Sequence, residues 1–245
     1  MNETAIWRAL RRARVAVFLL CVVAGSGFAL AQDEYDGAEF DSWTDFATIY
    51  KFGDKWRYDG DYGVRSVLTS RGFWQYYLRP SARYRAKRWL MLHGGVAYFR
   101  TNFDDGDPTN EIRPWVGLRL VGPRPGRYVF SHYFRGEWRS FYRGDDERES
   151  IGRARYQLQL TSPRFKIGSA ENFYWLTFVE FFHNFGSSLE GFEVAQFRFD
   201  VGAGKQLSRG LRLELNYLLQ KVAVEDLGLE PNDHILRVRL NYSFN

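Results

Sequence analysis

The amino-acid sequence predicts an all-β protein, specifically a transmembrane antiparallel up-and-down β-barrel of about twelve strands. Three observations support this prediction. Apolar and polar residues alternate with a period of two along most of the chain, the alternating runs are long, and an export signal precedes them. A barrel of ten strands is the alternative.

The beginning of the chain has the parts of a secretory signal peptide. Four arginines precede an apolar run from Val15 to Val23, and Ala29–Ala31 forms an A-x-A cleavage site before Gln32. A single membrane anchor is the weaker alternative, because the apolar run is shorter than the roughly 18 residues that a spanning helix needs.

We therefore predict three segments. Met1–Ala31 is a signal peptide, Gln32–Ser42 a lead-in segment, and Trp43–Asn245 an outer-membrane β-barrel. The mature chain has no cysteine, because Cys21 leaves with the signal, so disulfides and thiolate metal sites are excluded. Removal of the signal also lowers the formal net charge from +5 to +2. Because the protein is predicted to be exported, we do not expect nucleic acid as a partner.

Alternating runs separated by short clusters of Gly, Pro, Asp, Asn and Lys predict the strands, and no helical period of similar strength occurs. The predicted strands are Trp43–Phe52, Lys55–Val67, Phe73–Arg85, Trp89–Thr101, Asn110–Leu120, Tyr128–Tyr142, Ile151–Leu160, Phe173–Phe185, Val194–Lys205, Leu211–Val222 and His234–Phe244. These are eleven strands, whereas bacterial single-chain barrels normally have an even number. We therefore expect either a twelfth strand, for which Gln32–Ser42 offers room, or one false strand.

Each strand has one apolar and one polar face. In the last strand, Arg237 and Arg239 take the opposite parity to Leu236, Val238 and Leu240. A soluble sandwich or lipocalin-like barrel would bury the apolar face, whereas a membrane barrel exposes it to lipid. Strands often longer than ten residues favour the membrane barrel, since soluble strands average about 5–6 residues and a tilted span needs about 9–11.

Aromatic residues and connections agree with a membrane barrel. Trp and Tyr gather near strand ends, where two interfacial girdles are expected; they are Trp43, Tyr50, Trp56, Trp74, Tyr84, Trp89, Tyr98, Trp115, Tyr128, Tyr142 and Trp175. Short connections (FGDK, AKR, GPRPG, LSRG) alternate with longer acidic ones. The exception is TSPRFKIGSAEN, a long connection at the barrel end where the other connections are short. We expect the short connections on the periplasmic side.

The polar face is rich in arginine. From the second strand onward it carries fifteen arginines against seven acids, and such charges would cost about 2–4 kcal/mol each for Arg at the lipid midplane, so we expect them inside. The predicted lumen-lining residues are Arg79, Arg83, Glu111, Arg113, Arg135, Glu137, Arg139, Arg153, Arg155, Glu180, Arg198, Asp200, Arg212, Glu214, Arg237 and Arg239. They predict a structural Arg–carboxylate network, an anion-favouring pore lining, or both.

The chain resembles the domain-of-unknown-function 2490 family of Gram-negative outer-membrane proteins. The resemblance spans nearly all of the mature chain, and the residues that carry it are EIRPW, RGEWR, RARYQL, FVEFFHN, FRFDVGAG, LELNYLLQ and NDHILRVRLNYSF. It implies an outer-membrane barrel whose physiological role is not established, and it carries over no catalytic residues. One departure from barrel proteins generally is the final Asn245 after Phe244.

The sequence predicts no enzyme, metal site or cofactor. None of the four histidines has the spacing of a metal-binding pair, and Ser131 and His132 are neighbours, so they point to opposite faces. We expect a small passive pore or a structural barrel, with a lipid-acting enzyme or a plugged ligand-binding barrel as the alternative. The expected partners are outer-membrane lipid and, during insertion, the barrel-assembly machinery and periplasmic chaperones.

Overall fold

The computed structural model describes residues 39–68, 73–104, 106–144, 147–185, 194–224 and 228–244. The predicted signal peptide and residues 32–38 of the lead-in segment lie outside these residues. Among the described residues, no helix has both the length and the apolar character needed to cross a membrane.

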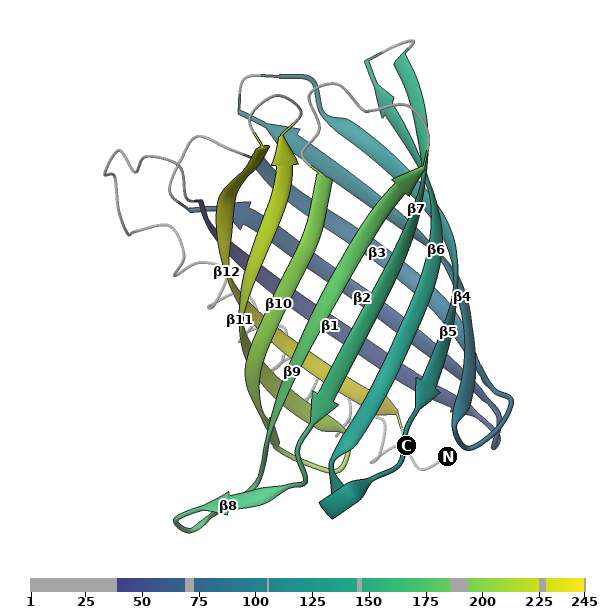
Figure 1. The fold of residues 1–245 in the computed structure, drawn as a ribbon, viewed down its shortest axis with the longest axis vertical. Helices are drawn as coiled ribbons and strands as arrows, with labels where there is room; N and C mark the ends of the chain where they lie inside the picture. The colour runs from purple at the N-terminus through teal and green to yellow at the C-terminus, as the bar shows by residue number, and fades with distance from the viewer. Residues whose placement is uncertain are drawn as a thin grey trace, which may run out of the picture.

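The described part of the chain contains twelve strands and one short 3-10 helix, Pro125–Arg127, and eleven of the strands form the wall of a closed barrel (Figure 1). The wall strands are β1 (Phe40–Phe52), β2 (Trp56–Val67), β3 (Phe73–Arg85), β4 (Leu90–Phe103), β5 (Thr109–Val121), β6 (Val129–Arg143), β7 (Glu147–Thr161), β9 (Ala170–Phe185), β10 (Val194–Gln206), β11 (Leu211–Val224) and β12 (Gly228–Phe244).

The predicted all-β barrel of about twelve strands is confirmed, but the twelfth strand is not part of the wall. It is β8 (Phe165–Ile167), which pairs only with the beginning of β9. This hairpin extends below the wall in Figure 1 and accounts for the long connection on the side of the short turns. Of the segment Gln32–Ser42, the structure describes residues 39–42, and β1 begins there at Phe40.

The odd number of wall strands determines how the barrel closes. Consecutive wall strands pair antiparallel, and β1 pairs with β12 in parallel, from Phe40 opposite His234 to Tyr50 opposite Phe244. Antiparallel alternation through eleven strands makes the first and last strands run in the same direction. The parallel ladder still pairs the backbone groups of both edges, so the barrel has no open edge.

The two faces of the wall have the reverse of the usual distribution in soluble proteins. Outward side chains are apolar and exposed, for example Val116 at 69% and Leu215 at 52%, whereas inward Asp200 and Asn216 are almost completely buried. Alternation along each strand produces this contrast, because successive side chains point to opposite faces. The outer surface is therefore a broad apolar band, and the polar side chains face the lumen.

The two ends of the barrel differ in their connections. We call the end that holds the C-terminus of β12 the lower end, as drawn in Figure 1. Residues 53–55, 86–89, 122–128 and 207–210 form its short turns, and Gly53 adopts a φ of +67° that favours glycine. The five connections of the upper end each include residues outside the described set.

Candidate functional site: a charged lumen

The lumen contains a cavity of about 910 Å³, to which all eleven wall strands contribute. Its lining extends from Glu39 and Asp104 near the upper end to Arg212 and Asn241 near the lower end. The volume falls within the range of roughly 300–1,000 Å³ that is typical of small-molecule sites. The wall thus encloses a long internal space rather than a completely filled core.

Fourteen of the sixteen residues predicted to line the lumen line this cavity. The two others, Glu137 and Asp200, also project inward, but their side chains are 0% exposed. Arginine side chains cover Glu137, and Asp200 is bonded by Arg237 at 2.9 Å and by Asn216 at 2.8 Å. Both carboxylates therefore hold neighbouring side chains in place rather than contacting the open space.

A central network joins three glutamates to six arginines from β5, β6, β7, β9 and β10. Glu137 is its most heavily paired member. It accepts hydrogen bonds from Arg153 Nε and Arg155 Nη1, each at 2.8 Å, and forms an ion pair with Arg135. Arg113 Nη1 lies 3.7 Å from the same carboxylate. Four guanidinium groups thus converge on one buried carboxylate.

The other two glutamates extend this network in opposite directions. Glu111 accepts two hydrogen bonds from Arg113 and two from Arg139, at 2.6–3.1 Å, which is a bidentate arrangement on both sides. Glu180 pairs with Arg155 at 2.5 Å and with Arg198 at 3.3 Å. The network therefore crosses five wall strands.

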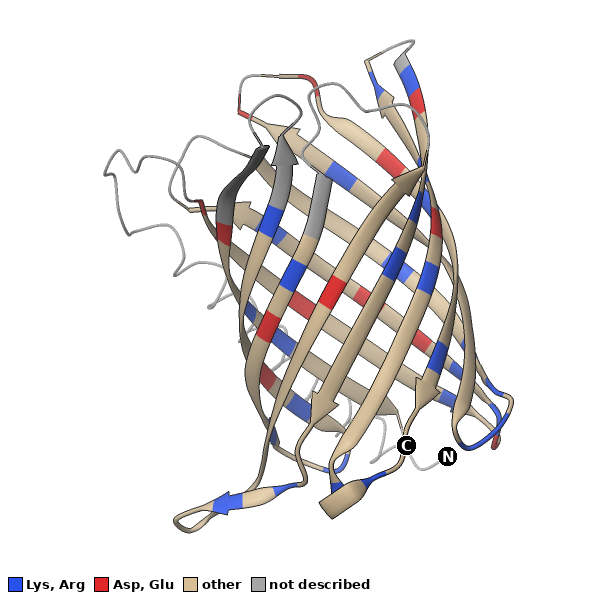
Figure 2. Cartoon of the chain, viewed as in Figure 1, with Lys and Arg blue, Asp and Glu red and all other residues tan. Residues whose placement is uncertain are grey.

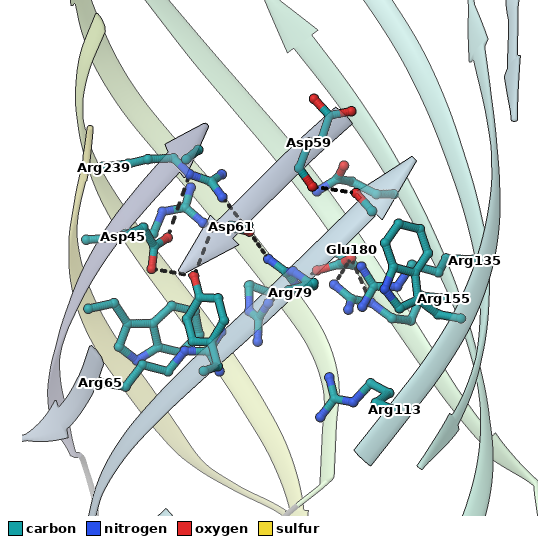
Figure 3. Close-up of a pocket in the computed structure, with 18 of the residues that line it drawn as sticks. Asp45, Asp59, Asp61, Arg65, Arg79, Arg113, Arg135, Arg155, Glu180 and Arg239 are labelled. Carbon is teal, nitrogen blue, oxygen red and sulfur yellow. Dashed lines mark hydrogen bonds and ion pairs between the residues drawn. The ribbon is translucent and has the colours of Figure 1, made fainter. Parts of the chain in front are cut away.

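A second cluster lies at the seam between β1 and β12 (Figure 3). Arg239 Nη2 on β12 donates to Asp61 Oδ2 on β2 at 2.8 Å, and Asp61 also pairs with Arg79 on β3. Tyr77 donates to Asp45 on β1 at 2.8 Å. Figure 3 shows Arg79 between this cluster and Glu180 of the central network, so charged side chains cross the lumen at this level.

A third cluster near the lower end has more arginine than carboxylate. Arg57 and Arg83 share Asp59, at 2.7 and 2.9 Å, and occupy directly opposed positions on β2 and β3. Arg119 on β5 donates to Ser131 at 3.0 Å and lies over the Tyr133 ring. All three arginines line the cavity. We call Arg57, Arg83 and Arg119 the lower arginines.

The upper rim has the opposite charge. Glu39, Asp41, Asp104 and Asp233 line the cavity there. Asp41 accepts a bond from Trp43 Nε1 and Asp233 accepts one from Gln220, so neutral donors hold these two carboxylates. Figure 2 shows how the charges are spread along the strands of the wall.

Aromatic rings narrow the lumen beside the arginines. The Arg65 guanidinium lies 4.0 Å from the centre of the Trp43 ring, and that of Arg135 lies 4.5 Å from the Trp115 ring. Such contacts stabilise a cation without a carboxylate. Both tryptophans are buried in the lumen, so their assignment to the outer girdles was wrong. The parity that Trp43 shares with Asp45 is the signal that would have placed it inside.

Comparison with known proteins gives one family. The family model described as a protein of unknown function, DUF2490, matches residues 40–227. The chain belongs to this family. The expected resemblance is thus confirmed, and the match begins at the first residue of β1 and ends before β12. A search of curated proteins found no match.

The lumen of this DUF2490 chain is less basic than the sequence indicated. Fourteen arginines and ten carboxylates line the cavity, and Glu137 and Asp200 raise the inward carboxylates to twelve. The earlier count of fifteen against seven left out Glu39, Asp41 and Asp45 because it began at the second strand. It left out Asp104 and Asp233 because they fall in predicted connections. Arg85, which was one of the fifteen arginines counted on the polar face, instead donates to the backbone of Asp54 at the lower turn.

The adjacent Ser131 and His132 lie on opposite faces of β6, as expected. Ser131 is inside and accepts the bond from Arg119, whereas the His132 ring lies 2.9 Å from the Tyr156 hydroxyl on the outer face. Within the described ranges, His, Cys, Asp and Glu side chains form no group of three that could hold a metal ion.

Proposed function

We propose that this protein is an outer-membrane barrel whose lumen is a narrow passage for small anions. The observation that carries the proposal is the lower cluster, in which Arg57 and Arg83 share Asp59 and the third cavity-lining arginine, Arg119, is held by the neutral Ser131. Like charges directly opposite each other on neighbouring strands are unfavourable, so Arg57 opposite Arg83 favours a mobile anion between them. Rings of arginine or lysine are a known basis of anion selectivity.

The outer-membrane location is supported by the exposed apolar face, the closed edge and the predicted signal peptide. In lipid, each unsatisfied backbone group costs several kcal/mol, and the parallel seam leaves no such edge. The short turns of the lower end correspond to the periplasmic side of barrels of this class. We therefore orient the lower arginines toward the periplasm.

Conductance measurements test the passage. The full mature protein is reconstituted in planar bilayers, and the reversal potential is measured across a KCl gradient. The double variant Arg83→Gln, Arg119→Gln should lower the anion-to-cation permeability ratio by about twofold or more, because it removes two fixed charges from a narrow space. The matched control is Lys205→Gln, which removes a cation from the outer face near the same end and should leave the ratio unchanged.

A second candidate, a structural barrel with a closed lumen, is favoured by the central network and by the aromatic rings that narrow the same level. If this candidate is correct, the reconstituted protein gives no steady current under any gradient. Current that is steady but equal for anions and cations would also overturn the anion passage. The barrel itself would stand in both cases.

A further inference from the structure

The part of the outer face that the structure describes carries charges of one sign between the two ends of the wall. Apart from the β8–β9 hairpin, where Glu171 pairs with Lys166, the described outward side chains of the wall strands include four charged residues, Arg100, Arg148, Lys205 and Lys221, and no carboxylate. Arg100, Arg148 and Lys221 lie near the upper end, and Lys205 lies near the lower end. Cations at these levels flank the apolar band instead of interrupting it.

Two of these cations belong to one row across the wall. Strand register places Arg100 opposite Asn110, Asn110 opposite Tyr142, and Tyr142 opposite Arg148. All four side chains have the outward parity. Neighbouring strands are about 4.8 Å apart, so the two arginine backbones are roughly 14 Å apart along the row.

Neutral groups hold both arginines in place. Arg100 donates to Asn102 and to Asn110, each at 3.3 Å, and Tyr98 donates to the same Asn110 oxygen at 2.7 Å. The Arg148 guanidinium lies 5.6 Å from the centre of the Tyr142 ring. Among the described residues, no carboxylate forms an ion pair with either arginine, and the groups that contact them are neutral.

The surface below the row is apolar. Val96, Ile112, Val116 and Trp138 are all well exposed on the outward face of β4, β5 and β6. A ligand complementary to this surface has an anionic group at the level of the row and hydrocarbon chains along the strands below it. A soluble anion would match only the first part.

We propose that this row binds the phosphate group of a membrane lipid in the leaflet around the upper end, with its acyl chains on the apolar surface below. The inference rests on the proposed membrane location, but not on the anion passage. Arginine suits this role because its guanidinium donates two parallel hydrogen bonds to phosphate oxygens, while its long side chain reaches up from the apolar band.

The test uses the full mature protein in vesicles of phosphatidylcholine containing a minor fraction of phosphatidic acid, whose headgroup is a bare phosphate. The lipids that remain bound after detergent extraction are quantified by native mass spectrometry. The protein should be enriched in phosphatidic acid over phosphatidylcholine, and each of Arg100→Gln and Arg148→Gln should lower this enrichment about fivefold. Arg100→Lys should retain most of it, and Lys205→Gln, the control at the other end, should leave this lipid bound at the upper row.

The outcomes separate the lipid site from the passage. No enrichment in the unaltered protein, or enrichment that survives Arg100→Gln combined with Arg148→Gln, would overturn the lipid site even if the barrel conducts anions. Enrichment that depends on the two arginines, in a barrel without current, would support the lipid site and overturn the passage. Failure of the unaltered protein to insert into vesicles would overturn both.

Discussion

Arg239 on β12 and Asp61 on β2 form an ion pair of 2.8 Å that spans β1, the strand between them. Arg239 Nε also lies 3.8 Å from Asp45 on β1. The last strand is thus joined to the first two strands by a parallel backbone ladder and by a side chain inside the lumen. Parallel pairing is slightly less stable per residue than antiparallel pairing, so this ion pair reinforces the parallel ladder that closes the wall.

Deletion of His234–Asn245 should prevent assembly. This segment supplies all eleven β12 positions of the ladder to β1 and includes Arg239. Without it, β1 and β11 become open edges, which lipid does not tolerate. Immunoblots of outer-membrane fractions measure the outcome, and normal accumulation of the truncated protein would contradict closure by β12.

The parallel seam predicts a specific cross-link. Thr48 and Tyr242 are opposite each other on the outer face, so cysteines at these two positions should form a disulfide on oxidation. Cysteines at Thr48 and Val238 are four residues out of register, about 13 Å, and should not. Gel mobility under non-reducing conditions reports the link. The reverse pattern would show that β1 and β12 do not pair in this register.

Glu137→Gln should destabilise the barrel strongly, on the order of 3–5 kcal/mol, because it leaves buried arginines around a neutral side chain. The matched control is Glu171→Gln in the β8–β9 hairpin. Glu171 is 55% exposed and pairs with Lys166, which is 69% exposed, so its loss should cost about 0–1 kcal/mol. Urea titration of the refolded protein in detergent measures both, and equal effects would refute a structural role for the central network.

Neutralising the upper rim should strengthen anion preference. Asp41→Asn with Asp233→Asn removes two cavity-lining carboxylates and keeps their size, so anions should meet a lower barrier at the upper end. Reversal potentials in a KCl gradient report the change. An unchanged reversal potential would mean that the rim charge does not face the conducting path, and a shift toward cations would contradict the prediction.

Alternation predicted most of the fold because each strand of the wall separates apolar from polar environments. It placed Arg198, Arg237 and Arg155 inside, and the structure brings all three into the lumen. The predicted first residues of the strands were less accurate. β7 begins at Glu147 rather than Ile151, because the strand extends beyond the residues in which apolar and polar side chains alternate clearly. The three-residue β8 is too short for alternation to reveal.

The pairing inside the lumen could not be read from the sequence. Parity shows that Arg239 and Asp61 share the interior, but barrel curvature and strand register bring residues this distant in the chain to 2.8 Å. Burial of Glu137 beneath four arginines depends on the same geometry. The parallel closure was likewise hidden by the expectation of an even strand number, although the alternating runs themselves numbered eleven.

The most direct test of a membrane barrel with a polar lumen compares two neighbouring residues of β12. Val238 faces outward and Arg239 lines the cavity. Heat-modifiable gel migration of outer-membrane fractions reports assembly of each variant. Val238→Arg should impair insertion, by about 2–4 kcal/mol near the midplane. Arg239→Gln should assemble, because Asp61 retains its ion pair with Arg79 and Asp45 still accepts the hydrogen bond from Tyr77. Normal insertion of Val238→Arg together with failure of Arg239→Gln would invert the two faces and contradict the membrane barrel.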